Sequence, residues 1–192
     1  LTTAAHAQQG GLRIGSTGSL DTRIPIAVPP FATSDPALAT AAREMAQIVA
    51  NDLAFSGLFI VLPAAQYPDG FIALETDAAS VNLSQWAATK AEHLVYGRVY
   101  RQGTSLIGEC RLFDLFGKEQ VKGMRIPAAM EKKRLMAHTF SEEIIRQLDG
   151  IPGIGTTEIC FAGGETGNKE LYVADYDGAN VRKITSYNSI TI

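Results

Sequence analysis

The side chains best suited to catalysis or metal binding are sparse in this sequence and stand apart from one another. The histidines are His6, His93 and His138, and none has a neighbour at a spacing typical of metal ligands. The chain contains no G-x-S-x-G segment, the turn that carries the nucleophile of many hydrolases. The sequence therefore predicts a protein that is not an enzyme and that holds no metal or cofactor.

Two segments have the composition of binding loops but lack the residues that complete one. Residues 163–167 supply the glycines of a phosphate loop, yet no Lys-Ser or Lys-Thr pair follows to meet the phosphates. Residues 175–180 resemble the start of a calcium loop, but the third acidic ligand and the closing glutamate are missing. The Asp177-Gly178 pair is typical of a tight turn because glycine accepts a positive φ angle. We interpret both segments as turns between strands.

The two cysteines, Cys110 and Cys160, fall in different predicted domains, and each lies within an apolar strand pattern. Two cysteines so placed do not make a disulfide scaffold, and we expect both to be buried free thiols, with a bridge between them as the alternative. Cys110 has no basic neighbour in the sequence, so a nucleophilic thiol is not indicated.

A first helix is indicated from Asp35 onward. Asp35 is a favourable N-cap, and Pro36 suits the first helical turn. Apolar residues recur at spacings of three and four from Leu38 to Leu53, which predicts one buried stripe. Gly57 lies where such a helix would end in the left-handed conformation.

The remaining elements are predicted from the alternation of apolar and polar residues and from residues typical of turns. A second helix is predicted from Asn82, carrying Trp86, and a long third helix over residues 130–148. Predicted strands lie near residues 26–28, 58–62, 93–101, 106–113 and 121–126. On the third helix the expected buried side consists of Leu135, Phe140, Ile144 or Ile145, and Leu148. Its basic residues Lys132, Lys133 and Arg134 are expected to be a solvated face.

This order of elements predicts an α/β (α+β) fold, with a mixed β-sheet packed with two to three helices. We assign residues 24–150 to this α/β domain. Residues 151–156 follow as a hinge, because glycine and proline are concentrated there. Further strands are predicted near residues 157–162, 170–174 and 181–185.

The N-terminal segment suggests export and a role in binding. Residues 1–7 include Ala5-His6-Ala7, which fits a signal-peptide cleavage site, so we interpret them as a signal-peptide remnant and expect a periplasmic protein. Residues 8–23 are rich in Gly, Ser and Thr, which is typical of a flexible arm. Within this arm Leu12, Arg13 and Ile14 alternate, as in a strand that adds to another protein's sheet. The alternative is a leader segment with no role.

The composition narrows the class of partner. Apolar residues make up 46% of the 192-residue chain, charged residues make up 19%, and the net charge is −3. Such a chain has no basic surface for nucleic acid or anionic membranes. It also has no apolar run of the roughly 18 residues needed to span a bilayer. We therefore expect protein partners.

Several segments together resemble the TolB family of the periplasmic Tol-Pal system. They are residues 24–31, residues 51–59, residues 95–99, Arg134 with His138, residues 148–153, and residues 167–185. The resemblance implies an N-terminal α/β domain followed by a six-bladed β-propeller, with residues 157–192 forming only the start of its first blade.

The resemblance also implies partners. In that family the N-terminal arm engages the inner-membrane protein TolA, and the corresponding positions here are Leu12, Arg13 and Ile14. Gly15-Ser16 follows them, where the family often continues the apolar alternation. The propeller binds the lipoprotein Pal through blades absent from this chain.

The function expected from these features is that of a non-enzymatic periplasmic scaffold. It would link TolA to Pal and serve envelope integrity and cell division. Two alternatives stay open: the N-terminal portion of an exported peptidase that contains a propeller, and a module that binds a small ligand.

Overall fold

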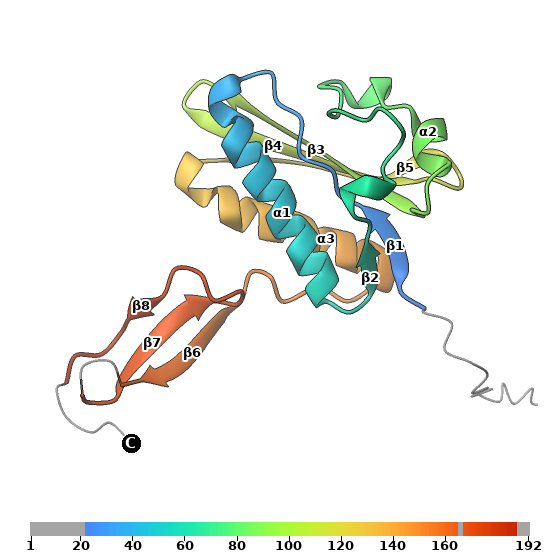
Figure 1. The fold of residues 1–192 in the computed structure, drawn as a ribbon. Helices are drawn as coiled ribbons and strands as arrows, with labels where there is room; N and C mark the ends of the chain where they lie inside the picture. The colour runs from blue at the N-terminus through green and yellow to red at the C-terminus, as the bar shows by residue number, and fades with distance from the viewer. Residues whose placement is uncertain (1–21, 165–166, 188–192) are drawn as a thin grey trace, which may run out of the picture.

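The chain forms two β-sheets in the computed structural model, which describes residues 22–164 and 167–187. The larger sheet has five strands in the order β2-β1-β3-β4-β5 (Figure 1). Their bounds are β1 Ile24–Ala27, β2 Phe59–Val61, β3 His93–Gln102, β4 Ser105–Asp114 and β5 Glu119–Ala128. Strand β1 runs parallel to β2 and β3, whereas β3, β4 and β5 form an antiparallel meander. The sheet is therefore mixed, as the sequence predicts.

Two long helices cover one face of this sheet, and a loop with a short helix covers the other (Figure 1). Helices α1 (Ala39–Phe55) and α3 (Lys133–Asp149) pack side by side. The short helix α2 (Leu83–Ala87) lies on the opposite face within the connection from β2 to β3. Among the described residues no helix is both long and apolar enough to cross a bilayer.

The start and end of α1 follow the predicted local signals. The Asp35 carboxylate accepts a hydrogen bond from the amide of Ala37 at 2.9 Å, and a 3-10 turn at Pro36–Leu38 leads into the helix. Gly57 adopts a φ of 73° just after the helix ends. The helix then returns the chain to β2, giving the crossover that two parallel strands require.

The apolar core lies on both faces of the larger sheet. Between the sheet and the long helices, α1 contributes Met45 and Val49, and α3 contributes Phe140 and Ile144. On the opposite face Trp86 is surrounded by the rings of Tyr67 and Phe71, each with its centroid 5.1 Å away. Both layers bury large side chains, and the first of them holds α1 and α3 on the sheet.

The buried stripe of α3 differs in part from the prediction. Phe140, Ile144 and Ile145 are buried as expected, but Leu135 is 48% exposed. Met136 and Ala137 are buried instead, since their spacing to Phe140, Ile144 and Ile145 places them on the face toward the sheet.

The basic residues at the start of α3 are also not a purely solvated face. The Lys133 ammonium bonds the Glu44 carboxylate of α1, and Arg134 bonds Asp177, which lies in a turn of the second sheet. The expectation of a solvated cluster was wrong because acidic groups from distant segments reach it.

The second sheet is small and antiparallel, in the order β6-β7-β8. Its strands are β6 Glu158–Gly163, β7 Glu170–Asp175 and β8 Arg182–Lys183. Both predicted turns are confirmed: the amide of Gly167 bonds the carbonyl of Gly164, and Gly178 adopts a φ of 82°. The sheet extends away from the body beyond α1 and α3 (Figure 1).

The two cysteines are free, but only one is buried. Cys110 lies in the core, and burial raises the pKa of its thiol to about 12. Cys160 lies on β6 and is exposed, so its expected burial was wrong. The apolar strand pattern did not reveal that no described segment covers this part of β6.

Candidate functional site

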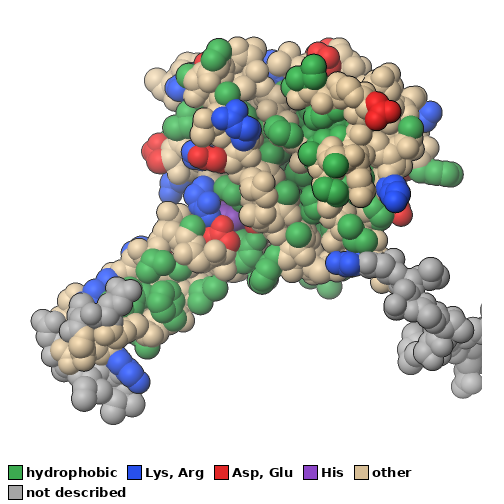
Figure 2. Space-filling view, in the orientation of Figure 1, with side chains coloured by type: hydrophobic (Ala, Val, Ile, Leu, Met, Phe, Trp, Pro, Cys, Tyr) green, Lys and Arg blue, Asp and Glu red, His purple; other side chains and the backbone are tan. Residues whose placement is uncertain are grey.

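Charged and polar side chains gather where the second sheet meets the body (Figure 2). Two elements of the body contribute to this joint, the end of α1 and the middle of α3. The third contributor is the turn that follows β7. The joint places residues from the beginning, middle and end of the described chain within hydrogen-bond distance.

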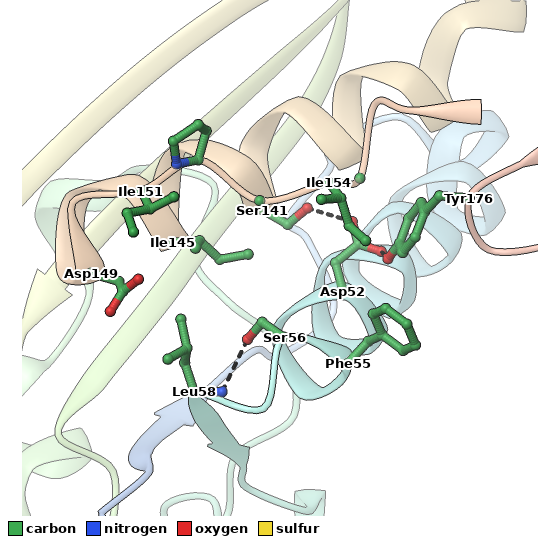
Figure 3. A pocket seen from close by; sticks show the side chains of 13 residues that line it. Asp52, Phe55, Ser56, Leu58, Ser141, Ile145, Asp149, Ile151, Ile154 and Tyr176 are labelled. Carbon is green, nitrogen blue, oxygen red and sulfur yellow. Dashed lines mark hydrogen bonds between the residues drawn. The ribbon is translucent and has the colours of Figure 1, made fainter. Parts of the chain in front are cut away.

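Asp52 on α1 is the centre of the joint. Its carboxylate is 5% exposed and accepts a hydrogen bond from Nδ1 of His138 at 2.8 Å. The hydroxyls of Ser141 and Tyr176 also donate to it (Figure 3). A carboxylate can only accept hydrogen bonds, so Nδ1 of His138 carries a proton. The buried carboxylate of Asp52 thus has three hydrogen-bond donors.

Tyr176 joins the second sheet to this carboxylate. Burial raises the pKa of its phenol, and the hydrogen bond to Asp52 raises it further. Its ring meets Phe55 edge-on at a centroid distance of 5.7 Å and His138 at 5.4 Å. Tyr176 therefore remains a neutral donor that is held by polar and aromatic contacts together.

A second set of contacts involves Arg134 of α3 and two acidic residues of the second sheet. The guanidinium bonds Asp177 and lies 3.7 Å from Asp175, measured from Nε to Oδ2. Burial alone would raise the pKa of the Asp177 carboxyl, but the Ala179 amide, Arg134 and the nearby His138 together hold it below its usual value. The ionised form of Asp177 is thus the form that docks the sheet.

Replacing Asp177 with asparagine should therefore destabilise the protein at neutral pH but not in strong acid. Because the pKa of Asp177 is lower in the folded than in the unfolded protein, the carboxylate stabilises the fold at pH values above the unfolded pKa of about 3.9. This contribution is lost as the pH falls through the folded pKa. Because the pair is partly exposed, we expect about 0.5 kcal/mol at pH 7. Calorimetric unfolding of both proteins at pH 7 and pH 3 measures it. A difference that is undiminished at pH 3 would contradict the assignment.

A pocket of about 300 Å³ opens beside Asp52, between the ends of α1 and α3 and the segment that follows α3 (Figure 3). Its wall is mostly apolar and includes Phe55, Ile151 and Ile154, all of which are exposed. Asp52, Ser141 and Tyr176 line its polar side. Such a mixture could receive a small apolar group or a segment of chain.

The residues Asp52, His138 and Ser141 have the types of a hydrolase triad but not its geometry. Ser141 is fully buried, and its hydroxyl lies within hydrogen-bond distance of Asp52 and of the backbone carbonyl of His138, to either of which its single proton can be donated. In a triad the serine would bond the imidazole nitrogen opposite the aspartate. Here that nitrogen, Nε2, faces Asp177 instead, so this cluster does not activate a nucleophile.

The sequence does not predict the joint, and it predicts binding residues in the N-terminal arm instead. Leu12, Arg13 and Ile14 of the arm fall outside the described residues. One signal in the sequence could have indicated the joint: Asp52 interrupts the apolar stripe of α1 between Val49 and Leu53. A charged residue on a buried helix face requires partners, and the sequence does not say which.

The sequence model of the TolB amino-terminal domain matches residues 12–121. The chain belongs to the TolB family. A Tol-Pal system protein TolB from Ruegeria sp. (strain TM1040) is 33% identical over 98% of this chain and 43% of its own length. That of Dinoroseobacter shibae is 36% identical over 100% of this chain and 44% of its own length. The chain thus spans under half the length of these TolB relatives.

The fold agrees with that of a solved TolB. The crystal structure of TolB from Acinetobacter baumannii matches 85% of this chain and 39% of its own, with a TM-score of 0.68 and 21% sequence identity. This likeness confirms the predicted fold class, a mixed sheet packed with helices and followed by strands of a second unit.

Proposed function

We propose that this TolB chain acts in the Tol-Pal system as a periplasmic scaffold without enzymatic activity. It would link the inner-membrane protein TolA to the lipoprotein Pal and thereby serve envelope integrity and cell division. The observation that carries the proposal is the match, over nearly the whole chain, to relatives that are named Tol-Pal system proteins. Residues 1–7 would be the remnant of the signal that directs export.

The second sheet supports the proposal that residues 157–192 begin a propeller after a hinge at residues 151–156. Apolar side chains lie exposed along its strands and just beyond them (Figure 2); they are Ile159, Phe161, Leu171, Val181 and Ile184. Apolar surface of this kind marks a sheet that packs against another element. A neighbouring blade would cover it, and the blades that bind Pal would follow in the chain.

The arm at residues 8–23 is the proposed contact with TolA, through Leu12, Arg13 and Ile14. An extended segment that joins a sheet edge gains backbone hydrogen bonds, and its alternating side chains add specificity. We propose that an exposed arm and an arm packed on the body are in competition, and that binding at the propeller shifts the balance.

Removing residues 8–14 from the full-length protein should strongly weaken its capture by the C-terminal domain of TolA. We expect at least a tenfold loss in a pull-down or in biolayer interferometry, since backbone pairing supplies most of the affinity in strand addition. A matched control deletes residues 15–21 instead, which removes the same number of residues and keeps Leu12, Arg13 and Ile14. Capture that is unchanged after the deletion would reject the role of the arm.

A further inference from the structure

Three side chains at the joint present metal-ligating atoms to one another. His138 of α3 offers an imidazole nitrogen, and Asp175 and Asp177 of the second sheet offer carboxylate oxygens; all three atoms lie within 4.8 Å of one another. Nε2 of His138 is 3.8 Å from Oδ2 of Asp177. Two ligand atoms of a tetrahedrally coordinated zinc ion lie about 3.4 Å apart at ordinary bond lengths. The three side chains would therefore need to move only a little closer together to form the site.

The nitrogen that points into this cluster forms no hydrogen bond with any residue that the structure describes. His138 is only 3% exposed, and its Nε2 atom is buried and unpartnered. In the neutral form of the ring the proton lies on Nδ1, where Asp52 accepts it at 2.8 Å. In that form Nε2 directs a lone pair toward two carboxylates, and a cation bound between them would satisfy all three groups.

We propose that His138, Asp175 and Asp177 bind a divalent transition-metal ion such as Zn²⁺. Neutral imidazole and carboxylate oxygen are both good zinc ligands, and water would complete the coordination. Asp52 is the outer partner that metal-bound histidines require: it orients the ring and raises the basicity of Nε2. The two carboxylates are oriented as well, because Asn180 donates to Asp175 at 2.6 Å and the Ala179 amide donates to Asp177 at 3.1 Å.

The ion has a route to this site. An open cavity of about 270 Å³ is lined by His138 and Asp175, and Glu158 and Asn180 lie on its wall. Arg134 lines the same cavity, and its side chain is 30% exposed. The guanidinium could therefore turn toward solvent and leave its place beside Asp175 and Asp177 to the ion.

Arg134 and the metal are thus competitors for the same carboxylates. Without the ion, the guanidinium docks the second sheet onto α3 by its contacts to Asp175 and Asp177. With the ion, its coordination bonds to His138 on one side and to Asp175 and Asp177 on the other would take over this docking. Binding would then hold the second sheet more firmly against the body, because coordination bonds would replace partly exposed ion pairs.

Isothermal titration of the purified, tag-free protein with Zn²⁺ tests the proposal. The exposed thiol of Cys160 is first removed by Cys160→Ser, so that it cannot bind the ion. In this background we expect one ion per chain, binding weakened at least tenfold by Asp177→Asn, and binding strengthened at least tenfold by Arg134→Gln. Asp69→Asn, a matched change in an exposed loop remote from the joint, should leave the affinity unchanged.

The opposite effects of two neighbouring substitutions distinguish this site from adventitious binding. A general loss of folding would weaken binding in both variants, whereas competition predicts that Arg134→Gln strengthens it. His138→Gln should remove binding, and a thermal melt shows whether that variant is folded. The proposal is overturned if Arg134→Gln binds no Zn²⁺, or if Asp177→Asn binds it as tightly as the parent protein.

Discussion

Replacing Asp52 with alanine is expected to lower the free energy of unfolding by about 2–4 kcal/mol. Its carboxylate is the shared acceptor for His138, Ser141 and Tyr176. Ser141 keeps a bond to the backbone, but the buried Nδ1 of His138 has no other acceptor, and an unsatisfied buried donor costs roughly 1–3 kcal/mol. Urea unfolding measures the loss, with the fluorescence of the single buried Trp86 as the signal.

Tyr176→Phe is the graded control for this prediction. It removes one donor from Asp52 and keeps the ring that packs against Phe55, so it should cost only about 1 kcal/mol. In Asp52→Ala the phenol has already lost its acceptor, so adding Tyr176→Phe should then cost little. If the two losses simply add, the hydroxyl and the carboxylate do not act as one unit.

The elements that could be predicted from sequence are those whose signals are local. The Asp35 cap, the left-handed Gly57 and the hairpin of β3 and β4 each depend on residues within a few positions of one another. Hydrophobic periodicity likewise places both long helices, because it reports which face is buried. Periodicity does not fix the rotation of a helix about its own axis to within one residue. The prediction that Leu135 lies on the buried side of α3 was therefore wrong.

The joint could not be predicted because its contacts are long-range. Asp52 and His138 are 86 positions apart, and Asp52 and Tyr176 are 124 positions apart. Which acid meets which base depends on how α1, α3 and the second sheet pack, and no spacing in the sequence encodes that. The sequence shows only that Asp52 stands on an apolar stripe, and therefore that some partner must exist.

Gly97 in the larger sheet has no room for a side chain, because the ring of Phe31 lies against it. The sequence does not indicate this contact. Gly97 lies in the middle of β3, and the ring of Phe31 lies directly over its α-carbon. A methyl group at position 97 would stand 2.1 Å from Cδ1 of Phe31. The ring cannot easily withdraw, because the amide of Ala32 bonds the carbonyl of Gly97 at 2.7 Å and Phe140 packs beyond it.

Gly97→Ala is accordingly expected to destabilise the protein by about 3 kcal/mol, the upper part of the usual range for overpacking a core. Gly164→Ala is the matched control, because a methyl group there meets no atom within 4 Å, and it should change stability by less than about 0.5 kcal/mol. Phe31→Ala alone should cost about 3–5 kcal/mol, since it leaves a cavity. Adding Gly97→Ala to that variant should cost much less than in the parent, because the methyl group then occupies the vacated space. Urea unfolding of the four proteins completes the cycle, and strictly additive losses would show that the ring does not exclude the methyl group.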